Sequence, residues 1–286
     1  MGIRDLYTFL QKHSVPFEQY RPSFFANSRI VVDGYSLFFR LFYTGKKISL
    51  SSHQSMAVSL LDAFLNKWPK TTSLIFVFDC PVKSQIKMET IQKRREMEQA
   101  IQKEIKDIEE AVQTSPFNPL LLARKDALQR RSKETFPSVC KEMRSLLLSK
   151  GYEIIVAKDE AEYHACEMVI NGKADFVYSN DSDCLALGCP AVIFDENGGF
   201  LKMYRHETIL RSLNLKTKEE FRDFCILLGT DYNGRLFGPE EAYSTIQRYG
   251  GIQSIPVSST HFEKITEGKL EDVQRQYTIT TQEMLG

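Results

Sequence analysis

Short apolar runs rich in β-branched residues alternate along this chain with longer amphipathic stretches. The runs have the length and composition of buried strands, which we expect at residues 29–33, 73–79, 152–157, 175–179 and 191–195. Amphipathic stretches at residues 54–67 and 136–149 have helical spacing, and Pro137 stands at a first-turn position of the second. Alternating strands and helices are typical of an α/β fold, in which helices cover a mainly parallel sheet.

Residues 83–135 break this alternation, because they are highly charged and contain no strand-like run. Apolar residues recur there at spacings of three and four, which gives a narrow stripe on an otherwise polar helix, formed by Met97, Ile101, Ile105, Ile108 and Val112. Such a helix cannot be buried on all sides. The pattern alone fits a pair of surface helices packed as a hairpin.

Acidic residues follow the ends of several apolar runs. They are Asp33, Asp79, Glu160, Glu162, Asp181, Asp183 and Asp231. In an open α/β sheet the carboxyl ends of the strands meet at one edge, where ligands bind. Carboxylates gathered there would repel one another unless hard cations lay between them, and ligation by oxygen alone suits Mg²⁺ or Mn²⁺. Any single one of these residues could instead be a helix cap or a solvated loop residue.

Composition allows this chemistry without indicating it. The 286 residues could form one large or two small domains, and 42% hydrophobic residues suffice for a core. The 37 basic and 37 acidic residues balance, so any surface that binds nucleic acid must be local. The six cysteines lack paired spacing and are read as buried thiols of an intracellular protein, and the five histidines share no zinc-ligand spacing. No apolar run approaches the roughly 20 residues of a membrane span.

A series of motifs in this order resembles the flap endonuclease (XPG-like) family of structure-specific 5′ nucleases. The series is MGI, VVDGYSLFF, VFD, DEAEYHAC, SNDSDCLALG, LLGTDY and GPEEAYSTIQRYG. The resemblance implies a PIN-like, mainly parallel twisted sheet with a helical arch and a helix-two-turn-helix element. It also implies a single nuclease domain over residues 1–286. Its parts would be an N-terminal region at 1–110, the arch at 83–135, and an internal region at 136–255 with the helix-two-turn-helix near 236–250.

The same resemblance implies two Mg²⁺ ions, which Mn²⁺ could replace. One ion would be bound by Asp33, Asp79, Glu160 and Glu162. The other would be bound by Asp181, Asp183 and Asp231, some of them through water.

Contacts to nucleic acid are implied as well. The family's two catalytic cations fall on Lys87 and Arg94, with Lys93 and Arg95 as neighbouring basic residues, although such a cluster can also be a solvated face. Phe39 falls where the family stacks an aromatic ring on a base, but it could equally be a core residue beside Phe38 and Phe42. Gly2 matches a position near the nucleic acid backbone, where the lack of a side chain allows close approach.

Departures from the family pattern concentrate near residue 238. The family's helix-two-turn-helix presents backbone groups to duplex phosphates and to a monovalent cation, here around Gly238. Glu240 and Glu241 follow Pro239, where a basic residue is usual, and carboxylates facing phosphates would oppose binding. Elsewhere, the departures are Tyr163, His164 and Asn180.

We therefore expect a Mg²⁺-dependent nuclease that hydrolyses DNA near single-strand/double-strand junctions, at flaps, nicks or 5′ ends. A family member that cuts RNA, as viral host-shutoff nucleases do, is the alternative, and a non-catalytic scaffold is the third interpretation. All seven carboxylates being present argues against the scaffold. The expected protein is monomeric and intracellular, nuclear or, if viral, cytoplasmic. We find no peptide for docking a sliding clamp, so we expect a catalytic core or a member that works without that partner.

Overall fold

The computed structural model of the protein describes residues 2–80, 88–114, 116–197, 199–256 and 270–279. The chain divides into two compact units. The first comprises residues 1–34, 68–82 and 154–286, and the second comprises residues 35–67 and 83–153.

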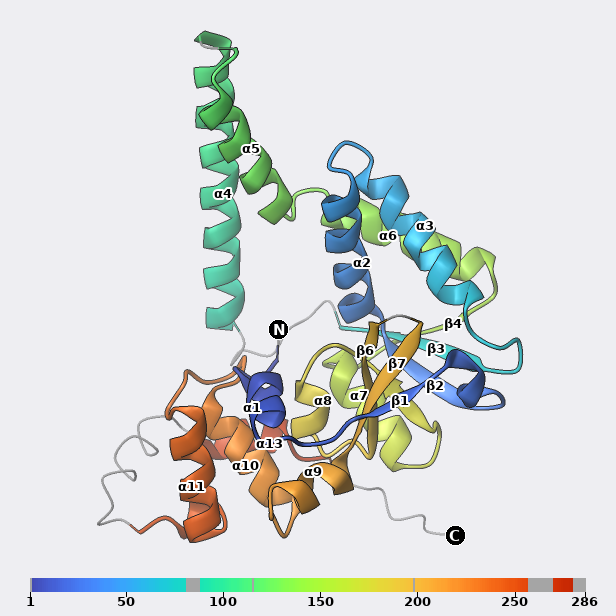
Figure 1. Ribbon diagram of the computed structural model, residues 1–286, viewed down its shortest axis with the longest axis vertical. Coiled ribbons are helices and arrows are strands. Elements are labelled where there is room, and N and C mark those ends of the chain that lie inside the picture. Colours follow the sequence, from blue (N-terminus) through green and yellow to red (C-terminus); the bar gives the residue numbers. More distant parts are fainter. Residues whose placement is uncertain (1, 81–87, 115, 198, 257–269, 280–286) are drawn as a thin grey trace. The chain divides into compact units, whose positions relative to one another are not determined.

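The first unit is built on a sheet of seven strands in the order β1-β7-β6-β5-β2-β3-β4 (Figure 1). The strands are β1 Glu18–Tyr20, β2 Arg29–Asp33, β3 Ser73–Phe78, β4 Glu153–Val156, β5 Phe176–Tyr178, β6 Ala191–Asn197 and β7 Phe200–Arg205. β2 pairs in parallel with β3 and β5, and β5 pairs in parallel with β6. β7 runs antiparallel to β6 and β1. The predicted α/β fold is confirmed, whereas the antiparallel edge formed by β1 and β7 was not predicted.

The central strands are apolar on both faces. Ile30, Val31 and Val32 of β2 are fully buried, as are Ile75 and Val77 of β3. A strand covered on both faces has no polar alternation, which is why these segments read as continuous apolar runs in the sequence.

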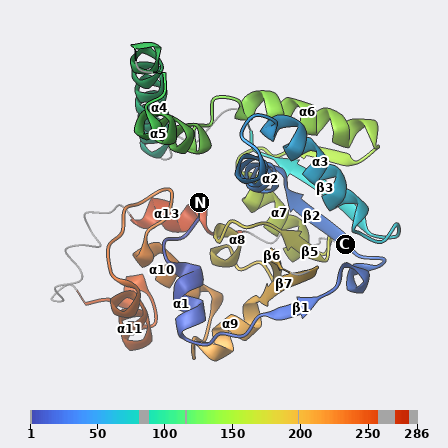
Figure 2. The ribbon, with the colours of Figure 1, turned by 45° about the horizontal axis from the view of Figure 1, so that its top comes forward.

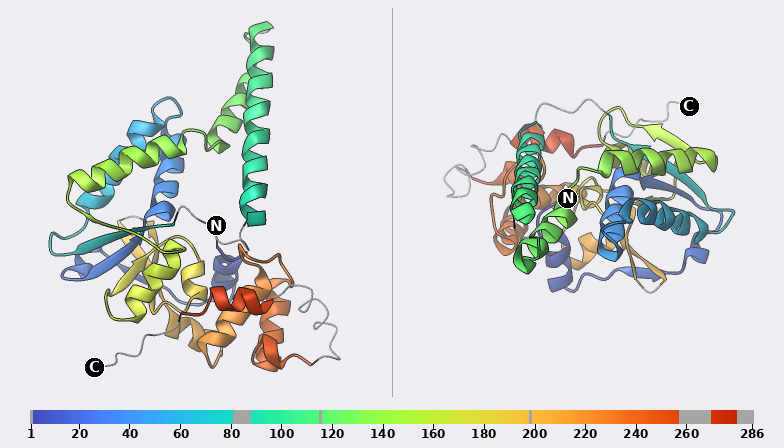
Figure 3. Two further views of the ribbon diagram at one scale, coloured as in Figure 1. Left: turned by 180° about the vertical axis from the view of Figure 1, so that it is seen from behind. Right: turned by 90° about the horizontal axis from the view of Figure 1, so that it is seen from above.

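Helices of the first unit share one hydrophobic core with the sheet (Figure 2). They are α1 Leu6–Lys12, α7 Ala161–Ile170, α8 Asp183–Ala186, α9 His206–Ser212, α10 Lys218–Leu228, α11 Pro239–Tyr249 and α13 Leu270–Gln276, with the short 3-10 helix Ile252–Ser254. A second 3-10 helix, Pro22–Phe25, precedes β2. α7 contacts β2, β3 and β5. Its first N–H bonds to Asp79 at the carboxyl end of β3, so the N-terminus of the helix lies at that end of the strand. Figure 3 shows α13 beside α10, which it contacts.

The second unit is helical. Its helices are α2 Gly34–Ile48, which begins directly after β2, α3 His53–Asn66, α4 Met88–Thr114, α5 Pro119–Arg131 and α6 Phe136–Ser149. α3 packs on α6, and α4 packs on α5 (Figure 1). A small cluster of Ile105, Ile108 and Leu128 joins α4 to α5. This is the hairpin that the apolar stripe predicted, although Met97, at one end of the stripe, is exposed.

Five of the six cysteines are buried, and none of the six forms a disulfide. Cys80 is only half-buried, so the expectation of a buried thiol is wrong at this position. Among the described residues, no helix is both long enough and apolar enough to cross a bilayer.

Candidate metal centre

Three adjacent parallel strands bring acidic residues to one edge of the sheet. Asp33 is the last residue of β2, and Asp79 directly follows β3. Asp181 lies three residues beyond Tyr178, the end of β5. β5, β2 and β3 are neighbours that run in the same direction, so their carboxyl ends meet. The placement follows the rule for ligand sites in open α/β sheets.

Two groups of carboxylates lie close enough for each to hold a metal ion. The first consists of Asp79, Glu160 and Glu162, and the second of Glu162, Asp181 and Asp183. Within each group, one ligand oxygen per residue lies within 4.8 Å of the others. Glu162 belongs to both groups. The donors are oxygens only, a set that fits Mg²⁺ or Mn²⁺ better than zinc.

The N-terminus of α7 supplies two of these carboxylates. Glu160 is the N-cap residue and Glu162 lies in the first turn. The first N–H group of the helix, on Ala161, donates a 2.9 Å hydrogen bond to Oδ1 of Asp79. Negative charge is stabilised at this end of a helix by its dipole and its unpaired N–H groups. The helix therefore both contributes to the first group and orients the aspartate that comes from β3.

The loop after β5 orders the second group. The buried hydroxyl of Ser179 donates a 2.8 Å hydrogen bond to Oδ2 of Asp33 and accepts one of 3.0 Å from the N–H of Asp181. The N–H of Asp183 donates to Oδ1 of Asp181 at 3.1 Å. These bonds fix the carboxylates relative to the backbone before any ligand binds.

The chain's N-terminus packs against this loop. The N–H of Ile3 donates a 2.8 Å hydrogen bond to the hydroxyl of Ser182. Gly2 is buried with a φ of +62°, and a Cβ at this position would overlap Oδ1 of Asp181 and Oγ of Ser182. In the described structure, the close approach that requires glycine at residue 2 is thus made to the acidic loop.

A pocket of about 220 Å³ opens beside the carboxylates. Its walls include Glu160, Glu162 and Asp183 together with Tyr277, from the segment that follows α13. Burial, and then the charge of Asp183, raise the pKa of Tyr277 well above its usual value. Its hydroxyl is therefore protonated throughout the neutral range. Sequence reasoning did not identify Tyr277, because no motif surrounds it.

Two of the seven predicted ligands stand apart from the two groups. Asp33 is buried and accepts the hydrogen bond from Ser179, and Asp231 lies half-buried in the turn after α10. The grouping also differs from the expected division, since Glu162 joins Asp181 and Asp183 as well as Asp79 and Glu160.

Three of the four predicted basic residues lie on α4, in the second unit. Lys87 lies outside the described residues. Arg94 is half-buried on α4, and after the effect of burial its charge lowers the pKa of Lys133. Lys93 and Arg95 are exposed on the same helix. Arg94 thus differs from these two neighbours in burial.

Phe39 is half-exposed on α2, whereas Phe38 and Phe42 are fully buried. Its ring meets those of Tyr43 and Phe136 edge-on, with centroids 4.8 and 5.3 Å apart, and the ammonium of Lys133 lies 4.9 Å from its centroid. Phe39 is therefore not a fully enclosed core residue.

The helix-two-turn-helix segment corresponds to α10, the turn after it, and α11. Gly238 is the N-cap residue of α11, and Pro239 follows in the first turn. Glu240 pairs with Nζ of Lys12 at 2.6 Å and with Nε2 of His13 at 3.1 Å. These hydrogen bonds, that from Lys12 above all, lower the pKa of Glu240. The ammonium of Lys12 thus offsets the negative charge of Glu240.

The other departures from the family pattern have structural roles. The hydroxyl of Tyr163 donates a 3.3 Å hydrogen bond to the carbonyl of Thr278. Nδ1 of His164 lies 3.6 Å from a carboxylate oxygen of Glu167, and His164 belongs to neither carboxylate group. The side-chain amide of Asn180 donates to the carbonyl of Phe194 on β6.

Sequence comparison matches residues 1–101 to the XPG N-terminal domain and residues 151–231 to the XPG I-region, which together are more than half of the chain. Flap endonuclease 1 of Haloquadratum walsbyi is 29% identical over 266 residues, 89% of this chain and 77% of the relative. Flap endonuclease 1 of Methanobrevibacter smithii is 33% identical over 168 residues, 57% of this chain and 48% of the relative. The chain thus spans about half the length of this second relative.

The fold resembles that of the catalytic core of Rad2 in complex with DNA substrate. The two structures superpose with a TM-score of 0.62 at 18% sequence identity, over 96% of this chain and 79% of the Rad2 chain. At this identity the likeness shows a common fold, with its helix-covered sheet.

Proposed function

The chain belongs to the flap endonuclease (XPG-like) family, and on that premise we propose that it is a divalent-metal-dependent nuclease that hydrolyses DNA phosphodiesters at flaps, nicks or 5′ ends. The observation that carries the proposal is the pair of carboxylate groups that share Glu162. Two adjoining all-oxygen sites are what a two-metal phosphodiesterase requires.

The carboxylates of both groups would hold Mg²⁺, with Mn²⁺ able to replace it. When bound, such cations activate water and stabilise the leaving oxygen of a phosphodiester. Groups of the chain itself orient the carboxylates. The Ala161 N–H and the Ser179 hydroxyl hold Asp79 and Asp33 in place, so these carboxylates need little rearrangement on binding. This preorganisation reduces the cost of reaching the reactive geometry.

Lys87 and Arg94 would stabilise charge on the phosphoryl oxygens, and Lys93 and Arg95 would bind neighbouring phosphates. Phe39 would stack on a base, which its half-exposed ring allows. Gly238 and the first turn of α11 would contact duplex phosphates, where a monovalent cation could also bind. The ion pair with Lys12 offsets the negative charge of Glu240, which lessens the repulsion between this turn and phosphates.

RNA is the alternative substrate, because the carboxylates of Glu240 and Glu241 in the first turn of α11 oppose binding to the phosphates of duplex DNA. Labelled flap, nicked, single-stranded DNA and RNA substrates incubated with Mg²⁺ or with EDTA distinguish the two. We expect Mg²⁺-dependent cleavage of the flap and nicked substrates. Preferential cleavage of RNA would identify an RNA nuclease. Absence of any cleavage would favour a scaffold, and full activity in excess EDTA would contradict the metal requirement.

A further inference from the structure

Within the first unit, a buried carboxylate on α10 binds the segment from Leu270 to Ile279. Oδ1 of Asp223, on α10, accepts a 2.9 Å hydrogen bond from the side-chain amide of Gln274 on α13. Its Oδ2 accepts a 3.0 Å bond from the N–H of Ile252, so one carboxylate joins three elements of the chain. Asp223 and Gln274 are both buried, where such bonds are costly to lose.

Thr278 is held from two sides. Nη1 of Arg222 donates a 3.0 Å hydrogen bond to its hydroxyl, and the hydroxyl of Tyr163 donates to its carbonyl at 3.3 Å. Tyr163 directly follows Glu162, the residue that both carboxylate groups share. Tyr163, which departs from the family pattern, therefore joins the helix that carries Glu162 to the segment that contains Thr278.

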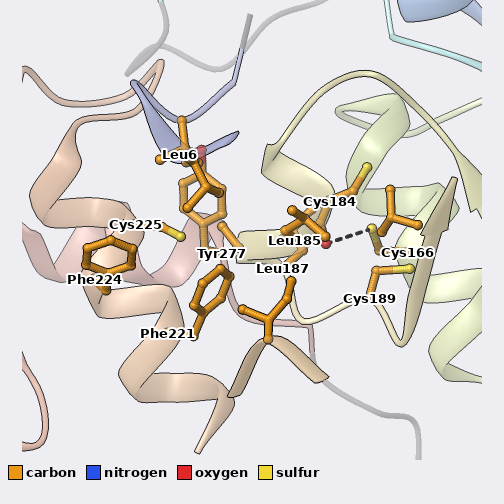
Figure 4. Packing of buried hydrophobic residues seen from close by; sticks show 14 of the residues in the cluster. Leu6, Cys166, Cys184, Leu185, Leu187, Cys189, Phe221, Phe224, Cys225 and Tyr277 are labelled. Atoms are coloured by element: carbon orange, nitrogen blue, oxygen red, sulfur yellow. Dashed lines mark hydrogen bonds between the residues drawn. The ribbon is translucent and has the colours of Figure 1, made fainter. Parts of the chain in front are cut away.

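Tyr277 lies between Gln274 and Thr278 in the chain and is only 3% exposed. Its ring packs in the core cluster that contains Leu187 and Cys225 (Figure 4), and it meets the ring of Tyr232 edge-on at 5.8 Å. It also forms part of the wall of the acidic pocket together with Asp183. Its buried hydroxyl makes no hydrogen bond of full geometry among the residues that the structure describes. The Asp183 side chain is nevertheless close enough for its charge and a hydrogen bond to raise the pKa of Tyr277, after the larger effect of burial.

A buried hydroxyl without a well-formed hydrogen bond costs on the order of 1–3 kcal/mol, and a phenylalanine would fill the same space without that cost. Because Asp183 lies beside it in the wall of the acidic pocket, the hydroxyl points to a role toward this carboxylate. Groups that hydrogen-bond to metal-binding side chains fix the ligand's orientation and raise metal affinity.

We propose that Tyr277 is a positioning residue of the metal centre, whose hydroxyl donates to the Asp183 carboxylate and fixes the oxygen that Asp183 presents to a divalent cation. This inference rests on the proposed function, because it assumes that the carboxylates bind such a cation. It adds a residue from the C-terminal segment, far in sequence from every motif of the site.

Calorimetric titration of the whole chain with Mn²⁺ tests it. We expect Tyr277→Phe, which keeps the ring, to weaken Mn²⁺ binding about tenfold. The Mg²⁺ concentration for half-maximal cleavage should rise by a similar factor, while the rate at saturating Mg²⁺ stays within about threefold of wild type. Tyr249→Phe is the matched control, because Tyr249 packs against the same core cluster outside the pocket and should leave both values unchanged.

Urea unfolding in EDTA checks that Tyr277→Phe is folded, since a purely structural role would lower stability there and leave Mn²⁺ affinity alone. If the variant does not fold, Tyr163→Phe replaces it, and loosening Thr278 should then weaken Mn²⁺ binding severalfold. Mn²⁺ affinity within twofold of wild type in the folded variant overturns the proposal for Tyr277 alone. A wild-type protein that binds no Mn²⁺ overturns the proposed function with it.

Discussion

Lys12 and Glu240 form an ion pair of 2.6 Å that joins the end of α1 to the first turn of α11. The residues are 228 positions apart, and both side chains are more than half exposed. An exposed pair of this kind contributes little to stability. Its effect is instead to occupy the Lys12 ammonium, which could otherwise bind phosphate.

Glu240→Gln should therefore tighten binding to a DNA junction and steepen its dependence on salt, because the Lys12 ammonium released from the carboxylate gains a phosphate partner. We expect a gain of severalfold near 0.1 M salt, measured by fluorescence anisotropy at several salt concentrations. Glu207→Gln, which removes an exposed pair with Arg211 on α9, is the control. Equal affinities for the two variants would mean that α11 does not face the duplex.

Gly2→Ala should disturb the acidic loop, because its Cβ would overlap Asp181 and Ser182. We expect the single-turnover cleavage rate to fall at least about tenfold, a loss of about 1.4 kcal/mol of transition-state stabilisation. Gly172 also has a positive φ, but the space around it is open. Gly172→Ala therefore measures the effect of placing alanine at a positive φ without a steric overlap. Similar rates for the two variants would show that Gly2 matters only for its backbone conformation.

Stability should fall in mild acid because of His206. Burial, followed by the nearby charge of Lys218, lowers its pKa from 6.5 to about 4. The unfolded chain therefore binds a proton more readily, so the contribution of neutral His206 is complete above pH 6.5 and is lost as the pH falls toward 4. Wild type should lose about 2 kcal/mol more than His206→Gln between pH 7.5 and pH 5 in urea unfolding. If the unfolding free energies of the two proteins fall equally with pH, protonation of His206 does not lower stability.

Arg94→Ala should slow the chemical step on the order of 100-fold with little loss of substrate affinity, since its proposed partner is charge that develops in the transition state. Lys93→Ala, which removes an exposed neighbour on the same helix, should weaken binding and leave the single-turnover rate nearly unchanged. Weakened binding with an unchanged rate in the Arg94 variant would make it an ordinary phosphate contact.

The sequence predicted the parallel centre of the sheet and missed its antiparallel edge. β2 and β3 are buried apolar runs apart from their first residues and Asp33, and this property is local. β1 is a three-residue strand, Glu18–Tyr20, that exists because Glu18 pairs with Met203 on β7. A pairing over such a separation leaves no mark in local periodicity.

The acidic residues were recognisable in the sequence, but their arrangement was not. Motif order suggested one set ending at Glu162 and another beginning at Asp181, whereas the helical start of α7 places Glu162 within reach of both. The roles of Tyr277 and of the Lys12 pair with Glu240 depend on contacts between distant segments, which no motif encodes.

Single-turnover cleavage of a 5′-flap DNA in Mg²⁺ by Glu162→Gln, beside Glu167→Gln from the same helix, tests the metal centre most directly. Glutamine keeps the shape of Glu162 and removes the charge that both carboxylate groups share. We predict that wild type and Glu167→Gln cleave alike and that Glu162→Gln is slower by more than about 100-fold, or about 2.7 kcal/mol. A Glu162→Gln rate within about tenfold of wild type would contradict a metal centre built on this residue.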